Sequence, residues 1–316
     1  MQKSSPIIRA RHVSHSFRGT EVLHDISFDV RPGEIFGFIG PNGAGKTTTI
    51  RAMATLLEPA SGRIEISGID VGLEPERVRR KIGYMADQAG VYPKLTVEEY
   101  LAFFAAAYGL EPVSATDLAL ERTGFGSARE QLTGTLSKGM RQRLQLAKTL
   151  LHDPEVLILD EPASDLDPRA RIEMRDLFVR LAEAGKTVFL SSHILTEMSD
   201  VCTSVGILEK GRLLTCGPLS QIVGPGGRTT AAPARRFKVR TLGPPASASA
   251  ALRGIEDVTI LASSGDQLTL GIRGGDDLVA AAVARLVEAG AGVIGLEPER
   301  DELETAFLEL TKREPE

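Results

Sequence analysis

The segment GPNGAGKTT, residues 40–48, has the residue types and spacing needed to hold phosphate groups. It matches the pattern G-x-x-x-x-G-K-[ST], in which glycines let backbone N–H groups converge on phosphate oxygens. The helix that should follow adds partial positive charge at its N-terminus. Lys46 would reach the terminal phosphates, and the hydroxyl of Thr47 would bind Mg²⁺. A Gly-rich turn before a helix is the plainer interpretation, but the strand expected at 35–39 favours a phosphate-binding loop.

A second candidate group follows the apolar run Val156–Leu159. Asp160 and Glu161 come directly after this run, so a buried strand would end in two carboxylates. Asp160 would lie at the Mg²⁺, and Glu161 would orient or deprotonate an attacking water. Two acids at a strand end could also be merely a solvated terminus. Together with an upstream phosphate-binding loop, they indicate a nucleotide-hydrolysing site.

Strands and helices alternate through the first two thirds of the chain. Apolar spacing predicts helices over residues 47–57, 96–110, 114–122, 140–151 and 168–185, and buried strands over 155–160 and 187–193. Residues 7–38 are expected to form short strands. This order predicts an α/β fold, a parallel sheet with helices on both faces. Off the apolar face of the fourth helix lie Arg141, Arg143 and Lys148, which we expect to be solvated.

A Gly/Pro/Ala-rich linker is expected at residues 224–234, between a domain at 1–223 and a small one at 235–316. Beyond the linker, the pattern predicts strand 235–242, helix 245–253, strands 255–262 and 267–273, helix 277–289, strand 291–297 and helix 301–312. This βαββαβ order with a final helix predicts a ferredoxin-like α+β domain.

Composition excludes several classes of protein. The 316 residues carry a net charge of −5, without the basic excess of a nucleic-acid binder. The N-terminus lacks a signal peptide's apolar core, and the apolar stretch at 101–110 is too short to span a bilayer. Two cysteines cannot form a metal cluster. We therefore expect a soluble protein whose membrane role, if any, comes through a partner.

The segment LSKGM, residues 136–140, resembles the signature motif of ATP-binding cassette (ABC) ATPases. The resemblance covers residues 7–222 and implies a P-loop NTPase core with an antiparallel β subdomain and a helical subdomain. The family more often has Ser-Gly-Gly-Gln here, so Lys138 and Met140 are substitutions. Ser137 and Gly139 remain, and the resemblance implies that they meet the γ-phosphate held by a partner cassette.

The resemblance also implies roles for single residues. Phe17 falls where the family places an adenine-stacking aromatic, although a core strand aromatic is the alternative. His193 resembles the switch histidine at the γ-phosphate, although it could be a strand-end histidine with a structural partner. Residues 164–167 resemble the loop that joins two protomers. ATP would contact the phosphate-binding loop through Gly40, Asn42, Gly43, Ala44, Gly45, Lys46, Thr47 and Thr48.

The segment after the strand expected at 82–85 places Asp87 where the family has a Gln that touches Mg²⁺ and the attacking water. The following Tyr92-Pro93 lies at the matching distance, so the register assigns this position to Asp87 and not to Gln88. A carboxylate suits Mg²⁺, which takes oxygen ligands and keeps several waters. The alternative is that Asp87 merely caps a loop.

The resemblance implies the ATP-hydrolysing subunit of a transporter, with ATP and Mg²⁺ as cofactors. Two cassettes, most simply a homodimer, would close head-to-tail and drive integral-membrane subunits docked near residues 84–110. The protein would then be cytoplasmic and peripheral on the inner face of the membrane. The ending DELETAFLELT, residues 301–311, resembles cassettes of drug, antibiotic or polysaccharide and lipid exporters, so export is expected and nucleic acid is not.

Two other functions remain open from the sequence. A soluble ABC ATPase acting on ribosomes or DNA should carry two cassettes or a long coiled-coil insertion, and neither is present. A regulatory cassette without catalysis should lack part of the acidic and basic set. Lys46, Asp160 and Glu161 are all present, which argues against that class.

Overall fold

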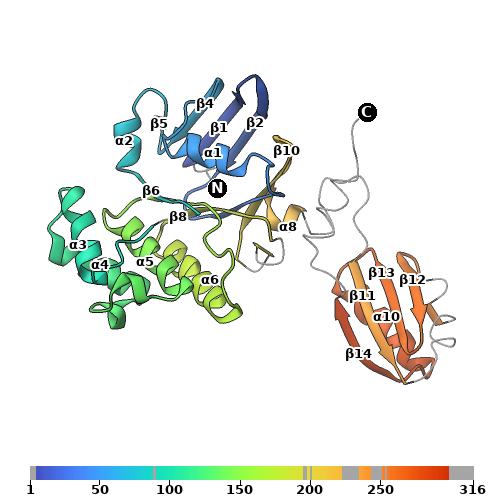
Figure 1. Cartoon of the computed structure of the whole chain (residues 1–316). Helices are drawn as coiled ribbons and strands as arrows, with labels where there is room; N and C mark the ends of the chain where they lie inside the picture. Colours follow the sequence, from blue (N-terminus) through green and yellow to red (C-terminus); the bar gives the residue numbers. More distant parts are fainter. Residues whose placement is uncertain are drawn as a thin grey trace. The chain divides into compact units, whose positions relative to one another are not determined.

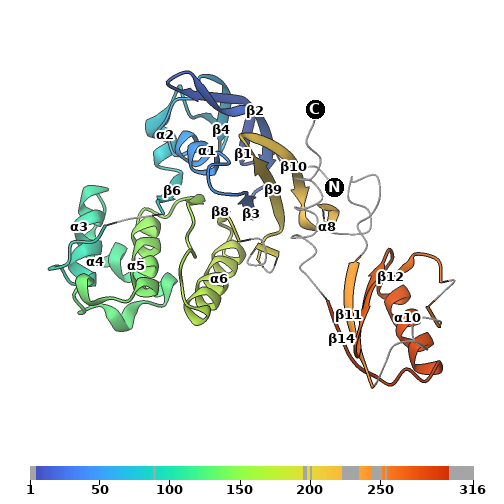
Figure 2. The same ribbon diagram turned by 45° about the vertical axis from the view of Figure 1, so that its right-hand side comes forward.

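The computed structural model describes residues 5–87, 90–194, 198–199, 201–222, 235–242, 251–252 and 255–298. The chain divides into two compact units, Met1–Gly217 and Pro218–Glu316. Figures 1 and 2 show both units, and each is described by itself.

A six-stranded sheet forms the centre of the first unit. Its order is β10-β9-β3-β8-β7-β6, and the pairs from β9 through β3, β8 and β7 to β6 are all parallel. The strands are β3 (Ile35–Ile39), β6 (Ile82–Met85), β7 (Val156–Leu159), β8 (Thr187–Ser192), β9 (Ser204–Glu209) and β10 (Arg212–Pro218). The parallel sheet expected from the alternating pattern is confirmed.

A second sheet, of four strands, packs on the first unit's core. Its order is β2-β1-β4-β5, and the neighbouring strands pair antiparallel. The strands are β1 (Ile8–Phe17), β2 (Thr20–Val30), β4 (Ser61–Ile66) and β5 (Ile69–Asp70). Strands β1 and β2 are longer than the short strands expected, because bulges let the two pair along nearly their whole length.

Helices cover both sides of the parallel sheet. In Figure 1, α5 (Lys138–Leu150) and α6 (Pro168–Glu183) lie on one side, while α1 (Lys46–Met53) and the antiparallel sheet lie on the other. Helix α1 ends earlier than expected. Thr55 has a left-handed φ of +62°, and its Oγ1 accepts a hydrogen bond from Nε of Arg79. A tertiary contact thus ends the helix before Pro59 could.

A helical cluster forms one end of the first unit. It contains α3 (Val97–Ala107), α4 (Pro112–Thr123) and α5, with the short helix α2 (Pro75–Arg79) and two 3₁₀ turns, Gly126–Ala128 and Thr133–Thr135, nearby in the chain. Thr96 begins α3 with a capping box, in which Glu99 bonds back to the Thr96 N–H. The apolar faces of the three helices share one core, which includes Tyr100, Leu120 and Leu144.

The second unit contains a four-stranded antiparallel sheet of order β12-β13-β11-β14 and the helix α10 (Asp276–Glu288). The strands are β11 (Arg235–Thr241), β12 (Val258–Ser264), β13 (Gln267–Ile272) and β14 (Val293–Pro298); a short helix, α8 (Leu219–Ile222), precedes them. The expected helix at 301–312, and most of that at 245–253, lie outside the described residues. Among the described residues, no helix combines the length and the apolar character needed to cross a membrane.

Four phenylalanine rings join the two sheets of the first unit. The rings of Phe28, Phe36 and Phe38 surround Phe189, with centroids 5.3 to 5.9 Å from its own. All four side chains are buried. Because Phe189 is on β8 and Phe28 on β2, this cluster fixes the antiparallel sheet against the strand that carries His193 at its end.

We predict that Phe189→Ala lowers the free energy of unfolding of the first unit by roughly 3–5 kcal/mol, because it leaves a cavity at the centre of the ring cluster. The control Leu73→Ala removes a side chain that is 79% exposed and should cost less than about 0.5 kcal/mol. Urea unfolding followed by circular dichroism measures both. Equal losses for the two variants would show that the ring cluster does not hold the sheets together.

Candidate functional site

The predicted phosphate-binding loop joins β3 to α1 and depends on two glycines for its shape. Gly45 has a φ of +104°, and a Cβ there would lie 2.6 Å from Cδ2 of Leu23. At Gly40 a Cβ would lie 2.2 Å from the carbonyl oxygen of Leu208. Side chains at either position would force the backbone to move. The loop therefore wraps closely against β2 and β9, and it presents Lys46 as the first residue of α1.

Lys46 is a buried cation with three oxygen neighbours. Its Nζ donates to the carbonyl oxygens of Gly40 at 2.7 Å and Pro41 at 3.2 Å, and it lies 3.3 Å from Oε1 of Glu161. The side chains of Lys46 and Glu161 are only 6% and 14% exposed. The ammonium thus lies within the mouth of its own loop, where an anion could replace the carboxylate.

Asp160 lies beneath this contact, at the carboxyl end of β7. Its carboxylate accepts a hydrogen bond from the Ser191 hydroxyl at 2.7 Å and one from Thr47. Burial raises the pKa of Asp160, and the charges of Glu161 and Asp87 raise it further, while the two hydroxyl bonds lower it. A buried carboxylate in this position gains most from a nearby cation.

Glu161 is held in a left-handed backbone conformation, with a φ of +48°. Its N–H donates to the Ser191 hydroxyl at 2.9 Å, and its Oε2 lies 2.9 Å from Nδ1 of His193. Such a conformation is costly for a residue with a Cβ, and it is found most often at functional sites. The carboxylate of Glu161 is therefore fixed between a cation, Lys46, and an imidazole.

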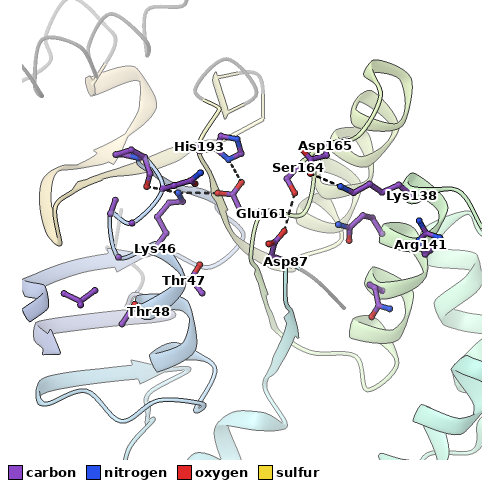
Figure 3. A pocket seen from close by; sticks show the side chains of 18 residues that line it. Lys46, Thr47, Thr48, Asp87, Lys138, Arg141, Glu161, Ser164, Asp165 and His193 are labelled. Atoms are coloured by element: carbon purple, nitrogen blue, oxygen red, sulfur yellow. Dashed lines mark hydrogen bonds and ion pairs between the residues drawn. The ribbon is translucent and has the colours of Figure 1, made fainter. Parts of the chain in front are cut away.

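These side chains open into a pocket of about 720 Å³, within the ~300–1,000 Å³ typical of ligand sites. Figure 3 shows Lys46, Thr47 and Thr48 on one wall, with Lys138 and Arg141 on the facing helix. The lining residues are Val22, Pro41, Asn42, Gly43, Ala44, Gly45, Lys46, Thr47, Thr48, Asp87, Lys138, Arg141, Gln142, Gln145, Glu161, Ser164, Asp165 and His193. Most of the residues predicted for one site do lie around one pocket.

Asp87 is exposed at the end of β6 and lines the same pocket. Its Oδ1 accepts a hydrogen bond from the Ser164 hydroxyl at 3.4 Å (Figure 3). Ser164 belongs to the loop after Glu161, so the contact joins two segments at the carboxyl ends of neighbouring strands. Gln88, the other candidate for this position, lies outside the described residues.

One set of lining residues was not expected from the sequence. Lys138, Arg141, Gln142 and Gln145 follow each other at helical spacing and form a polar stripe along α5. Gln145 is 2% exposed, and its Oε1 has no hydrogen-bond partner among the described residues. In the sequence, the only hint of this stripe was that Gln142 and Gln145 lie three residues apart, at helical spacing, beside the charged residues of the helix. The stripe turns one face of α5 into a wall of the pocket.

The expectation that the basic residues of this helix are solvated is wrong. Arg141 lines the pocket, and Arg143 forms an ion pair with Glu173 at 2.6 Å. The Lys148 Nζ lies 5.1 Å from the Phe104 ring centroid, and burial lowers its pKa. Arg143 and Lys148 contact neighbouring helices, because α5 is packed between α3, α4 and α6. Arg141 instead donates to the carbonyl oxygen of Leu136.

Five predicted residues are not among those that line the pocket: Gly40 and Asp160, whose contacts are given above, and Phe17, Ser137 and Gly139. Phe17 is at the end of β1, 46% exposed, with its ring centroid 4.5 Å from that of His15. Its exposure excludes the alternative of a core aromatic. Ser137 caps α5, and its hydroxyl oxygen accepts from the Met140 N–H at 3.2 Å. Gly139 faces α6, where a Cβ would lie 2.9 Å from that of Ala170.

Comparison with known proteins gives the family. Residues 23–164 match the family model described as ABC transporter. The chain is 41% identical over 211 residues to the bacitracin transport ATP-binding protein BcrA of Bacillus licheniformis, covering 66% of this chain and 69% of that protein. It is 29% identical over 312 residues to the linearmycin resistance ATP-binding protein LnrL of Bacillus subtilis, covering 97% and 99%.

A solved ATP-binding subunit of an ABC transporter has a matching fold. The TM-score is 0.62 at 32% sequence identity, and the match covers 71% of this chain and 95% of that structure. Family match, relatives and fold agree with the phosphate-binding loop and the paired acids of the pocket. The chain belongs to the ATP-binding subunits of ABC transporters, whose characteristic activity is ATP hydrolysis.

Proposed function

We propose that this subunit powers export, and that two copies close head-to-tail around ATP while docked on separate integral-membrane subunits. The geometry that carries the proposal is the meeting of Lys46, Glu161 and His193 at one pocket. A positively charged loop and a fixed carboxylate are the two parts that hydrolysis of a triphosphate needs.

The names of the relatives support the direction of transport. LnrL is named for linearmycin resistance and BcrA for bacitracin transport. A third relative, the daunorubicin/doxorubicin resistance ATP-binding protein DrrA of Streptomyces peucetius, is 37% identical over 209 residues. Resistance to a toxic compound is most simply achieved by removing it. We therefore infer a drug or antibiotic as the exported class.

Mg²⁺ fits the residues beside the predicted phosphate site. Asp160 offers a buried carboxylate with a raised pKa, and Thr47 offers a hydroxyl next to it. The described residues contain no group of three or more acidic, His or Cys side chains that could hold a metal ion without a ligand. Mg²⁺ in proteins is commonly held by one or two carboxylates together with substrate phosphates. When bound, it would neutralise charge on the phosphate oxygens.

Glu161 and His193 would then act on the attacking water. Glu161 accepts the water's proton or orients it, and His193 keeps the Glu161 carboxylate in place through the 2.9 Å contact. Lys46 binds the terminal phosphates only after it leaves Glu161, so nucleotide binding also frees the carboxylate for catalysis. Asp87 would help to hold Mg²⁺ or would position the attacking water.

The remaining predicted contacts complete the nucleotide site in this proposal. Phe17, exposed at a strand end, is available to stack on adenine. Ser137 accepts a hydrogen bond from Met140, which leaves its O–H free to donate to a phosphate oxygen. Ser137 and Gly139 would meet the γ-phosphate bound by the partner, and the loop at residues 164–167 would join the two copies.

The membrane subunits would dock on the surface near residues 84–110, with the protein peripheral on the cytoplasmic face. Tyr92, Phe103 and Tyr108 are each about half exposed there, between 51% and 53%. The ring of Phe103 lies edge-on to that of Tyr92. Exposed aromatic groups of this kind are typical of protein interfaces.

We infer that the second unit is a ferredoxin-like domain that begins near residue 235, after a linker at 224–234. The strand order β12-β13-β11-β14 supports this, since it places the first and third strands at the centre of an antiparallel sheet. Helix α10 connects β13 to β14, as the second helix of that topology would.

We predict that Glu161→Gln keeps its affinity for Mg·ATP but loses roughly 10²-fold or more in turnover, because the amide cannot accept the water's proton. The ATP-bound dimer should then accumulate, since hydrolysis no longer reopens it. Glu183→Gln, an exposed position on α6, is the matched control and should retain wild-type turnover. Wild-type turnover in Glu161→Gln would remove this residue from catalysis.

We predict that Asp87→Ala slows hydrolysis and its coupling to transport more than it weakens ATP binding, because Asp87 acts on the metal and water and not on the adenine or loop contacts. Gln88→Ala should be nearly silent. ATPase rates and nucleotide affinities for both variants test this assignment. If Gln88→Ala strongly impairs hydrolysis and Asp87→Ala has a mild effect, the family's Gln position belongs to Gln88 and not to Asp87.

A further inference from the structure

The start of α5 presents a lysine to the pocket at a position where the family more often has glycine. Lys138 lines the pocket, whereas its neighbours Ser137 and Gly139 do not. Figure 3 shows the Lys138 side chain extending from the helix toward the loop that follows Glu161. Relative to glycine, Lys138 adds a cation to a pocket suited to a triphosphate.

Among the residues that the structure describes, Lys138 has one ion-pair partner, Asp165, and that partner is easily displaced. Its Nζ lies 2.9 Å from Oδ2 of Asp165, with the two side chains 47% and 83% exposed. Exposed pairs of this kind contribute only ~0–1 kcal/mol, because water screens them. Lysine keeps three rotatable donors on a flexible stem, so its ammonium can change partner without a backbone shift.

The other cations of the pocket are held more firmly. Lys46 is buried against two carbonyl oxygens and Glu161. Arg141 donates to the carbonyl oxygen of Leu136 at 3.0 Å, within its own helix start. On the wall opposite the phosphate-binding loop, Lys138 is therefore the cation best able to move onto a ligand.

The charge of the pocket favours such a move. Asp87, Glu161 and Asp165 place three carboxylates on its lining. Asp87 adds a negative charge where the family has a neutral Gln, which opposes the binding of a triphosphate. In a symmetric head-to-tail dimer, Lys138 of one copy would bring a positive charge to the site that contains the other copy's Asp87, and it would offset that substitution there.

We propose that Lys138 binds the γ-phosphate of ATP held by the partner copy, and that Asp165 holds Lys138 while nucleotide is absent. The inference rests on the head-to-tail dimer of the proposed function. On closure the ammonium exchanges one exposed carboxylate for a phosphate oxygen, a charge-assisted hydrogen bond with a more highly charged anion. Asp165 thus competes with ATP for Lys138, and it lowers the tendency of the subunit to dimerise before nucleotide is bound.

The test uses the full chain carrying Glu161→Gln, with Mg·ATP as the ligand and dimer formation measured by light scattering. Lys138→Gln removes the charge and keeps a polar side chain that is one atom shorter. It should raise the ATP concentration for half-dimerisation by roughly tenfold or more. Asp165→Asn should lower that concentration, because it frees Lys138. Lys138→Arg should restore dimerisation in part, and Arg169→Gln, at a 90% exposed position on α6, should change nothing.

The direction of the Asp165→Asn effect separates the two possible roles of the pair. If Lys138 and Asp165 only staple α5 to its neighbouring loop, both variants should weaken dimerisation alike, and that result overturns the proposal. Mg·ATP affinity at protein concentrations where only monomer is present should be unchanged by Lys138→Gln. A loss there would overturn the contact across the dimer. If Glu161→Gln alone does not dimerise with ATP, the head-to-tail dimer itself fails, which is a distinct outcome.

Discussion

The contact between the Lys46 ammonium and the Glu161 carboxylate is the interaction on which the rest of the site depends. Both side chains are nearly buried, and the ammonium also satisfies two carbonyl oxygens of its own loop. A buried charge without a partner is strongly unfavourable, so an anionic neighbour stabilises Lys46. Glu161 fills that place in this structure, and phosphate oxygens would fill it with ATP. In the proposed mechanism, one cation therefore couples the arrival of substrate to the release of the catalytic carboxylate.

The surrounding fold orients the side chains of both Lys46 and Glu161 toward this contact. Gly45 allows the loop to close over Lys46, and the left-handed backbone of Glu161 turns its side chain back toward the loop. The Ser191 hydroxyl accepts from the N–H of Glu161 and donates to Asp160. One side chain of β8 thus fixes both acids. The ring cluster around Phe189 on the same strand links this arrangement to the antiparallel sheet.

The convergence of Lys46, Glu161 and His193 could be predicted from the sequence, because β3, β7 and β8 are parallel neighbours and their carboxyl ends meet at one edge. Their motifs and apolar runs carry that information locally. The end of α1 could not be predicted, since it depends on a contact between Thr55 and Arg79. The same is true of the Lys138–Asp165 pair, whose residues lie on separate elements. Long-range contacts between loops leave no periodic signal.

The most direct test is a crystal structure of the wild-type subunit with a non-hydrolysable ATP analogue and Mg²⁺. The Glu161→Gln subunit is not suitable, because the substitution itself alters the contact between Lys46 and Glu161. We predict that Nζ of Lys46 then lies within hydrogen-bond distance of a terminal phosphate oxygen and no longer contacts Glu161. The Glu161 carboxylate should keep its contact with His193. A bound analogue with the Lys46–Glu161 pair still intact would contradict the account.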